Sequence, residues 1–401
     1  MTAVPGRQIP FGRPWIDDSD REAVLSVLNG HILTHGPQGK AFEEEFGAAM
    51  RAGEPGEPRE PGEMSAHCVS VSSCMAALHL AYLHLGLGPG HEVLVPAQTH
   101  TATVHAVEWV GAKPVFVDCD PATGNVTPEA LERAITPRTR ALSVVHFVGI
   151  PCDMPAIMAI AGRHRLMVVE DCAIAVGARF EGRHVGLFGD AGCFSFYPVK
   201  HITTGEGGMF VSKHRDVAAA VSRLRAFGVD RAHAERNVPG MYDVTTLGLN
   251  YRMSEMQAAL GRTQLRRLPE NLERRQANFA ALKAAVSALP GLRMLDAVDP
   301  RAANSHYCAS IVFDGALGSR RHDLIAQLNT RGIGTSIYYP HPVPRMAYYR
   351  QKYGYNAAGF PGAEAISDRS IALPVGPHIT ADDVEYMGEA LAACVTEVGV
   401  S

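Results

Sequence analysis

Lys200 is the side chain of this sequence best suited to covalent chemistry. It follows an apolar run at residues 193–197 (CFSFY) and precedes a glycine-rich stretch at 205–208 (GEGG). A lysine at the end of a buried strand can direct its amine at a ligand beyond the edge of the sheet. Apolar and aromatic neighbours shield the amine from water, which lowers its pKa and leaves more of it neutral and nucleophilic. Taken alone, a lysine in this position is more often an ordinary surface residue of a loop, so the assignment depends on its partners.

Asp171 is the first such partner, because it ends another apolar run at residues 166–171 (LMVVED). The carboxyl ends of parallel strands meet at one edge of a sheet, where Lys200 is also expected. A carboxylate there can hold a protonated pyridine nitrogen, and proteins combine such an aspartate with a lysine to bind and tune pyridoxal phosphate. The other possibility for Asp171 is a helix N-cap. Glu170 is the alternative carboxylate, but the alternation of a strand points it to the opposite face.

The small residues at 72–78 (SSCMAAL) predict a phosphate site. Ser73, Cys74 and Met75 lie where a strand turns into a helix, and the free N–H groups and dipole of a helix start attract phosphate. The signal is weak by itself, because every strand-to-helix turn looks similar. His100 follows the apolar run 92–96, and its ring could stack on a flat cofactor, although a lone histidine is more often a surface residue or one with satisfied polar atoms.

The elements that must position these side chains alternate between short apolar runs and amphipathic segments. Continuous apolar runs are typical of strands buried on both faces of a mostly parallel sheet, so the pattern predicts an α/β domain. We expect strands at 68–73, 92–96, 114–118, 141–147, 166–171 and 193–197, and helices at 75–85, 127–135 and 154–164.

The C-terminal part of the chain predicts a second, smaller αβ unit. Residues 253–290 are helical in pattern, and beyond them we expect strands near 306–313 and 333–338 and helices near 321–330 and 380–395. We therefore expect a large domain at 1–270 and a small domain at 271–401. The stretch 52–65 is rich in Pro, Gly and Glu, which predicts an exposed loop within the large domain.

Composition excludes several classes of protein. The chain has 401 residues, 46% hydrophobic and 19% charged, with a net charge of −4, which excludes a disordered protein and argues against nucleic-acid binding through a basic surface. No apolar run reaches the roughly 20 residues of a membrane span, and the start of the chain lacks a signal-peptide pattern, so we expect a cytoplasmic protein. The eight cysteines are scattered without a CxxC pair, so we expect reduced thiols and no metal site.

A series of motifs in one order gives a resemblance over nearly the whole chain. The sequence resembles the nucleotide-sugar aminotransferase family of DegT/StrS type. The resemblance implies the aspartate-aminotransferase-like fold of pyridoxal phosphate enzymes (fold type I), with a mostly parallel, seven-stranded-type sheet between helices and a smaller α/β C-terminal domain. It also implies a homodimer with active sites at the subunit interface, and transfer of an amino group, with L-glutamate as expected donor, to a 4-keto or 3-keto deoxysugar linked to a nucleotide. The motifs are SSCMAALHLAYL, PAQTHTATVHAV, VFVDCDP, HFVGIPCDM, VVEDCAIAVGA, GDAGCFSFYPVKHITTGEGG, LGLNYRMSEMQAALG and SDRSIALPVGPHIT.

The resemblance assigns roles to individual residues. Lys200 matches the lysine that bonds covalently to the cofactor, and Asp171 matches the partner of the pyridine nitrogen. Ser195 and the backbone at Cys74 and Met75, in the turn that begins at Ser73, match the phosphate-binding groups. Two further matches are Asn250, which is implied to reach the phosphate of the neighbouring subunit, and His100, at a position where an aromatic ring usually stacks on the cofactor.

Two residues depart from the family pattern. Met75 lacks the hydroxyl that relatives carry in the phosphate turn, so one charge-assisted hydrogen bond of about 1.5 to 3 kcal/mol must be missing or replaced. Ile174 stands where relatives often have Gln or His near the ring hydroxyl of the cofactor, which predicts a less polar ring site. For the substrate, the expected contacts are Arg231, whose guanidinium suits a diphosphate, and Tyr338, His341, Trp15 and His35.

Some alternatives stay open at this point. The acceptor could be another keto sugar or a cyclitol, or the chain could be a non-catalytic regulator that holds pyridoxal phosphate on the same fold. Sugar dehydration is disfavoured, because the dehydrating relatives replace the lysine at this position by histidine, whereas residue 200 is Lys. An iron–sulfur dehydratase needs a compact set of cysteines, which the sequence does not supply.

Overall fold

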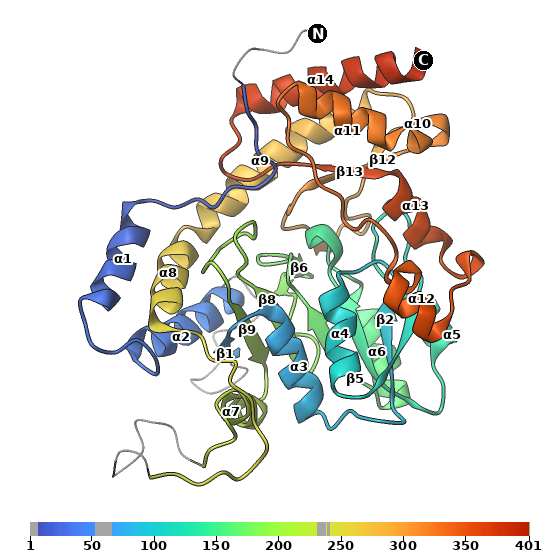
Figure 1. The fold of residues 1–401 in the computed structure, drawn as a ribbon. Coiled ribbons are helices and arrows are strands. Elements are labelled where there is room, and N and C mark those ends of the chain that lie inside the picture. The colour runs from blue at the N-terminus through green and yellow to red at the C-terminus, as the bar shows by residue number, and fades with distance from the viewer. Residues whose placement is uncertain (1–6, 53–65, 231–237, 239–240, 401) are drawn as a thin grey trace.

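A computed structural model describes residues 7–52, 66–230, 238 and 241–400 of the chain (Figure 1). The predicted loop at 52–65, except Ala52, and the predicted substrate residue Arg231 lie outside the described residues.

The centre of the molecule is a seven-stranded sheet in the order β1-β9-β8-β5-β4-β2-β3. The five strands from β8 to β3 are parallel, and β9 runs antiparallel to both of its neighbours. The predicted α/β class and mostly parallel sheet are therefore confirmed. The strands are β1 (His67–Val71), β2 (Glu92–Pro96), β3 (Lys113–Val117), β4 (Thr139–Val145), β5 (Met167–Asp171), β8 (Ala191–Ser195) and β9 (Gly208–Ser212).

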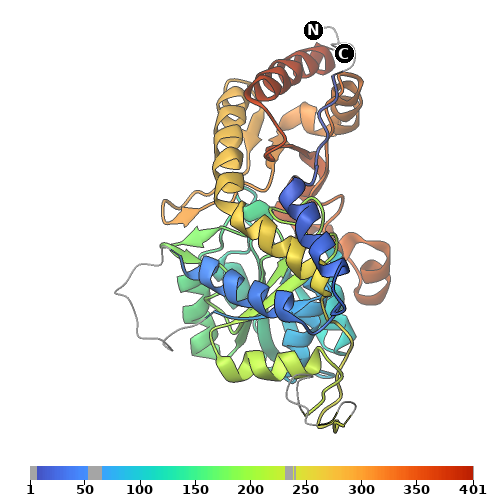
Figure 2. The ribbon, with the colours of Figure 1, turned by 90° about the vertical axis from the view of Figure 1, so that its left-hand side faces the viewer.

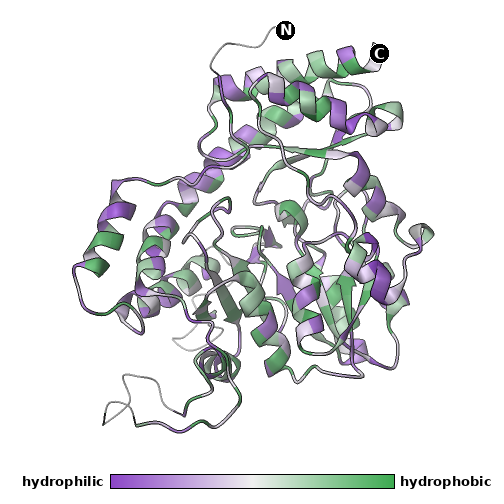
Figure 3. Cartoon of the chain, in the orientation of Figure 1, coloured by the Kyte–Doolittle hydropathy of each residue, from purple (hydrophilic) through white to green (hydrophobic). Residues whose placement is uncertain are grey.

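Helices cover both faces of this sheet because alternate strand residues enter different cores. Val93 and Val95 pack with α3, α4 and α7, whereas Leu94 packs with α5 and α6. A third core joins α2 and α8 to the sheet near β8 and β9. Figure 3 shows the strands in mostly hydrophobic colours and the covering helices with both colours, as two-sided burial of the sheet requires. The helices are α2 (Pro37–Arg51), α3 (Cys74–His84), α4 (Thr101–Trp109), α5 (Pro128–Ala134), α6 (Met154–His164), α7 (Arg215–Leu224) and α8 (Glu255–Arg266).

A second core lies in the C-terminal part, around an antiparallel sheet in the order β10-β12-β13. Helix α9 (Leu268–Ser287) leads from the large sheet into this core, where Phe279 and Leu282 are buried with Ile9 from the N-terminal segment. The division of the chain at residue 270 stays a prediction. The other elements here are β10 (Leu292–Met294), β12 (Ala309–Phe313), α10 (Gly315–Ser319), α11 (Arg321–Thr330), α12 (Ala347–Tyr353), α13 (Pro361–Arg369), β13 (Ser370–Leu373) and α14 (Ala381–Val400).

The strand predicted near 333–338 is wrong. Only isolated bridges occur there, from Ile333 to Ile9 and from Ser336 to Ala372. The apolar residues that suggested a strand instead fill the space between the two parts of the molecule, since Tyr338 and Tyr339 pack on the core that contains Phe147 and Tyr307.

The remaining elements lie at the margins of the large sheet. Helix α1 (Asp18–Leu28) packs on α8, and both face the viewer with α2 and α7 in Figure 2. A small sheet joins β6 (Arg179–Phe180) to β7 (Arg183–His184) and β11 (Ala302–Ala303). Within the described ranges, no helix combines the length and the apolar character that crossing a bilayer requires.

Candidate active site at the carboxyl edge of the sheet

The sheet topology brings the predicted cofactor residues to one edge. Strand β1 is antiparallel to β9, and β9 is antiparallel to β8, so β1 runs parallel to β8 and to the rest of the sheet. The carboxyl ends of β1, β2, β5 and β8 therefore open on the same side. Ser73, Asp171 and Ser195 lie at three of these ends, and His100 follows the fourth.

The turn after β1 has the geometry of an anion site. Ser73 is the N-cap of α3, and its Oγ accepts a hydrogen bond from the backbone N–H of Ala76 at 3.1 Å. The amides of Cys74 and Met75 begin the helix, where an N–H group has no carbonyl of its own helix to bond. Ser195 is 8% exposed beside this turn. Two free amides and a helix dipole can hold a phosphate here.

Gly208 explains how the turn approaches the sheet so closely. This first residue of β9 lies between Val71 of β1 and Ser195 of β8. A Cβ at position 208 would lie 2.5 Å from the carbonyl carbon of Ser73 and 2.6 Å from the nitrogen of Cys74. The glycine-rich segment after Lys200 thus lets the helix start rest directly on the sheet.

Asp171 is held with its carboxylate near this turn. It is 4% exposed, and Oδ2 accepts a hydrogen bond from Oγ1 of Thr103 at 2.7 Å while Oδ1 accepts one from the N–H of Ala173 at 3.0 Å. The Sγ atom of Cys74 lies 3.9 Å from Oδ1, which joins the carboxylate to the start of α3. The residues after Asp171 form turns and no helix, so the alternative of a helix N-cap is wrong.

Glu170 points to the opposite face, as strand alternation predicts. Its carboxylate accepts hydrogen bonds from the backbone of residues 186, 188 and 189 and from His146 Nε2 at 3.1 Å. Burial alone would raise the pKa of Glu170, but these donors, His146 foremost, hold it below the ordinary value. Glu170, His146 and Cys172 lie close enough together for a metal ion. Nδ1 of His146 already accepts from the N–H of Cys152 and both Glu170 oxygens are occupied, so we assign this cluster a structural role.

Lys200 is a half-buried amine beside these groups. Burial lowers its pKa to about 8, although nearby Cys74 and Asp171 act in the opposite direction. Its Nζ lies 5.0 Å from the ring centre of Tyr307, and it forms no ion pair with any carboxylate of the described residues. A substantial fraction of this amine is therefore neutral near physiological pH and available as a nucleophile or a proton carrier.

His100 and two tyrosines form the other wall. The ring of His100 contacts Tyr339 edge to face, with 5.5 Å between ring centres, and its Nδ1 caps α4 by accepting from the N–H of Ala102. The hydroxyls of Tyr338 and Tyr307 lie 2.8 Å apart. Tyr338 is thereby linked to the residue that lies against Lys200, which supports its candidacy as a substrate contact.

Sequence reasoning missed Thr103, Tyr307 and Tyr339. Each lies in a region that could be recognised as site-forming only after the strand ends were assembled. Thr103 lies one helical turn after His100, the N-cap of α4, and this spacing was the signal available in the sequence.

The predicted departures from the family pattern are visible in the structure. Ile174 is 2% exposed and lies in an apolar cluster with Phe147 and Tyr307. Met75 is half-buried, packed against the core of α3 and the sheet.

Two other predicted substrate residues, Trp15 and His341, each contact an arginine. Trp15 packs against the guanidinium groups of Arg267 and Arg274, at 5.4 and 4.9 Å from its ring. His341 is exposed, and its Nδ1 lies 2.8 Å from the guanidinium of Arg345. Both have structural partners, and a substrate role for either stays a prediction.

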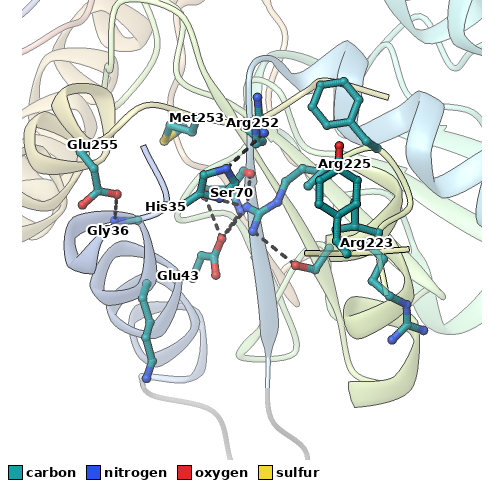
Figure 4. A pocket seen from close by; sticks show the side chains of 16 residues that line it. His35, Gly36, Glu43, Ser70, Arg223, Arg225, Arg252, Met253 and Glu255 are labelled. Carbon is teal, nitrogen blue, oxygen red and sulfur yellow. Dashed lines mark hydrogen bonds and ion pairs between the residues drawn. The ribbon is translucent and has the colours of Figure 1, made fainter. Parts of the chain in front are cut away.

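His35 lines a cavity of about 530 Å³ (Figure 4), and Asn250 forms a β-bridge with Ala226, another residue of the cavity wall. His35 Nε2 is 3.1 Å from Arg252 in its wall, and Arg225 pairs with Glu43 at 2.7 Å. Asn250 immediately precedes Tyr251, whose carbonyl accepts the N–H of Ser72 at 2.8 Å. Asn250 is therefore adjacent in sequence to a residue that contacts the turn, and it is exposed to solvent.

Comparison with known proteins places this arrangement in a family. Residues 14–392 match the model of the DegT/DnrJ/EryC1/StrS aminotransferase family. The spore coat polysaccharide biosynthesis protein SpsC of Bacillus subtilis is 36% identical over 387 residues, 96% of each chain.

Solved structures give the same result. S. venezuelae DesV, solved in complex with a ketimine intermediate, is 33% identical with a TM-score of 0.84, over 96% of this chain and 98% of that one. Streptococcus pneumoniae Spr1654 in its PLP form is 27% identical with a TM-score of 0.88, over 98% and 100%. The family implies dependence on pyridoxal phosphate (PLP), and the predicted enzyme class, a transaminase, is confirmed. With a lysine, an aspartate and a helix start assembled at one sheet edge and a family model matched over nearly its full length, this chain belongs to the DegT/DnrJ/EryC1/StrS aminotransferase family.

Proposed function

We propose that the protein transfers an amino group from L-glutamate to the keto group of a nucleotide-linked 4-keto or 3-keto deoxysugar. The observation that carries this proposal is the shielded amine of Lys200 near the fixed carboxylate of Asp171, at the edge where α3 begins. A sugar as acceptor is supported by the names of SpsC, a spore coat polysaccharide biosynthesis protein, and of CalS13 from Micromonospora echinospora, a sugar aminotransferase that is 28% identical to this chain.

The residues present fit PLP. The amides of Cys74 and Met75 with Ser195 would hold the phosphate, Asp171 the pyridine nitrogen, and Lys200 the reactive carbon, while His100 would lie on the ring. When bound, PLP supplies an electron sink that stabilises negative charge on the carbon of the amino acid. The side chain of Ile174 has no polar atom for the ring hydroxyl, so that contact would fall to other groups or to water.

Lys200 and Asp171 have different roles in the proposed reaction. Lys200 Nζ would carry a proton between the substrate carbon and the cofactor, away from the donor carbon in the first half of the reaction and onto the acceptor carbon in the second. A pKa of about 8 is well matched to this role near neutral pH. The hydrogen bonds that Asp171 accepts from Thr103 and Ala173 hold its carboxylate in position, so it can keep a cationic nitrogen in place. Tyr338, His341 and Arg231 are the proposed contacts of the sugar nucleotide.

The proposed assembly is a homodimer in which Asn250 of one protomer reaches the phosphate of its partner. Its support is the exposed position of Asn250 and a set of exposed apolar side chains, of which Phe227 and Tyr242 line the cavity of Figure 4. Leu247 is 92% exposed and Met241 is 67% exposed, values that a partner surface would explain. The others of this set are Leu25, Leu28, Ile32, Leu33, Phe227, Tyr242 and Val244. A cytoplasmic location also stays a prediction.

The activity is tested with purified protein, PLP, glutamate and a panel of nucleotide ketosugars, with the product mass as the readout. We expect one or more sugars to gain an amino group, and Lys200→Ala to lose this turnover. Lys113→Ala, which changes a surface lysine paired with Glu92, is the matched control and should keep full activity. Full turnover by Lys200→Ala would refute the assignment.

Shared sites are tested by mixing two inactive variants, Lys200→Ala and Asn250→Ala. A hybrid dimer contains one site with an intact Lys200 from one protomer and an intact Asn250 from the other. We therefore expect partial recovery of activity on mixing and re-association. No recovery, with hybrids demonstrated by mass, would show that Asn250 serves its own protomer.

A further inference from the structure

Thr103 is a buried threonine on α4 with a direct link to Asp171. Its side chain is completely buried, and its Oγ1 donates a hydrogen bond to Asp171 Oδ2 at 2.7 Å. The same Oγ1 lies 2.8 Å from Oγ1 of Thr99, which is 1% exposed. A hydroxyl has one proton, and Thr103 gives its proton to the carboxylate, so Thr99 must donate to Thr103. The two hydroxyls form a directed chain that ends on Asp171.

The other neighbours of Asp171 do not duplicate this contact. The N–H of Ala173 donates to the other oxygen, Oδ1, at 3.0 Å. The thiol of Cys74 is 3.4 Å from the carbonyl of Cys193 but 3.9 Å from Asp171 Oδ1, so the carbonyl is its better acceptor. Among the residues that the structure describes, Thr103 is thus the one side chain that donates to Oδ2 at an ordinary hydrogen-bond distance.

We propose that Thr103, supported by Thr99, is a positioning residue that sets the orientation and hydrogen-bonding capacity of Asp171 toward the cofactor's ring nitrogen. Thr103 donates to Oδ2 and Ala173 donates to Oδ1, so the carboxylate is held at both oxygens and cannot rotate freely. The remaining lone pairs of these oxygens can accept a hydrogen bond from the ring nitrogen. Residues that hydrogen-bond to a ligand-binding side chain, without touching the ligand, commonly determine how strongly that side chain binds it. The inference rests on the proposed function, because the ring nitrogen belongs to PLP.

The test compares Thr103→Val, which replaces the hydroxyl by a methyl group of similar size, with Thr103→Ser, which keeps the hydroxyl. Thr101→Val, on the same helix and without a bond to Asp171, is the matched control. Cofactor-free protein is titrated with PLP, and both the dissociation constant and the pH dependence of the bound cofactor's absorbance are measured. We expect Thr103→Val to bind PLP about tenfold to a hundredfold more weakly, since a hydrogen bond to a charged group is lost. Its absorbance titration should also shift, whereas the serine and Thr101 variants should behave like the wild type.

A double-mutant cycle separates this role from a general effect on folding. In an Asp171→Asn background, Thr103→Val should change PLP affinity by less than about threefold, because the charged acceptor is gone. An equally large effect in that background, or wild-type affinity and titration for Thr103→Val, would overturn the inference while the proposed function stands. Failure of the wild type to bind PLP would overturn both. If Thr103→Val does not fold, Thr99→Val carries the same test with a smaller expected loss, and wild-type behaviour of Thr99→Val then counts against the inference.

Discussion

Replacing Gly208 by Ala should damage the cofactor site through the backbone alone. The new Cβ would lie 2.5 Å from the carbonyl carbon of Ser73, 2.6 Å from the nitrogen of Cys74 and 2.7 Å from the carbonyl oxygen of Phe194. Carbon atoms in contact prefer separations of about 3.5 to 4.0 Å. All three neighbours are main-chain atoms, so no side chain can turn away, and the start of α3 must move by roughly 1 Å relative to β9.

The expected cost follows from that movement. Overpacking in a rigid region costs about 1 to 3 kcal/mol of folding free energy. A 1 Å displacement of binding groups can cost on the order of a hundredfold in function. Because the displaced groups are the amides of Cys74 and Met75, we expect Gly208→Ala to bind PLP about tenfold to a hundredfold more weakly than the wild type, or about 1.4 to 2.8 kcal/mol.

The assay is a PLP titration of cofactor-free protein, followed by thermal unfolding with and without PLP. Gly162→Ala is the control, because its Cβ meets nothing within 4 Å and it lies inside α6. Alanine there should be neutral or stabilise the protein by up to about 1 kcal/mol. If Gly208→Ala binds PLP with wild-type affinity and unfolds at the wild-type temperature, the assignment of this turn as the phosphate site is refuted.

Three further predictions concern charge, assembly and substrate. Burial lowers the pKa of Lys200 from 10.5 to about 8, so the unfolded chain binds more protons than the folded chain between these pH values. Lys200 therefore lowers the free energy of unfolding at pH values below 8. This loss of stability fades as the pH rises toward 10.5. Lys200→Met should therefore stabilise the cofactor-free protein at pH 7 by up to about 3 kcal/mol and show no gain at pH 10.5, as measured by urea unfolding; an equal gain at both values would contradict the lowered pKa. Leu247→Asp should convert the proposed dimer to monomers in sedimentation experiments, and an unchanged mass would show that Leu247 is not part of the interface. Arg231→Ala should raise the KM of the sugar nucleotide at least tenfold more than that of glutamate, and equal changes would argue against a diphosphate contact.

Much of the fold and site could be predicted because the signals were local. The buried strands are visible in the sequence as apolar runs, and Lys200 and Asp171 lie at or just after the ends of such runs. Their proximity at one sheet edge could be predicted because the carboxyl ends of parallel strands share that edge. Strand β9 was not predicted, because it begins at Gly208 within the glycine-rich stretch after Lys200 and runs against the direction of the other strands.

The remaining differences come from tertiary contacts that no sequence spacing records. Thr103 reaches Asp171 across 68 positions of sequence, and only the packing of α4 on the sheet brings them together. Tyr338 ended the strand predicted near 333–338, but its burial against Phe147 and Tyr307 outweighed its preference for extended pairing.

The central claim is that Lys200 is the residue that bonds covalently to PLP. Its most direct test is reduction of the protein–PLP complex with borohydride, digestion and mass spectrometry of the peptides. We predict that the added mass of the reduced cofactor lies on Lys200. If the added mass is absent from the protein, or lies on another lysine such as Lys213, then Lys200 is not the residue that bonds to PLP.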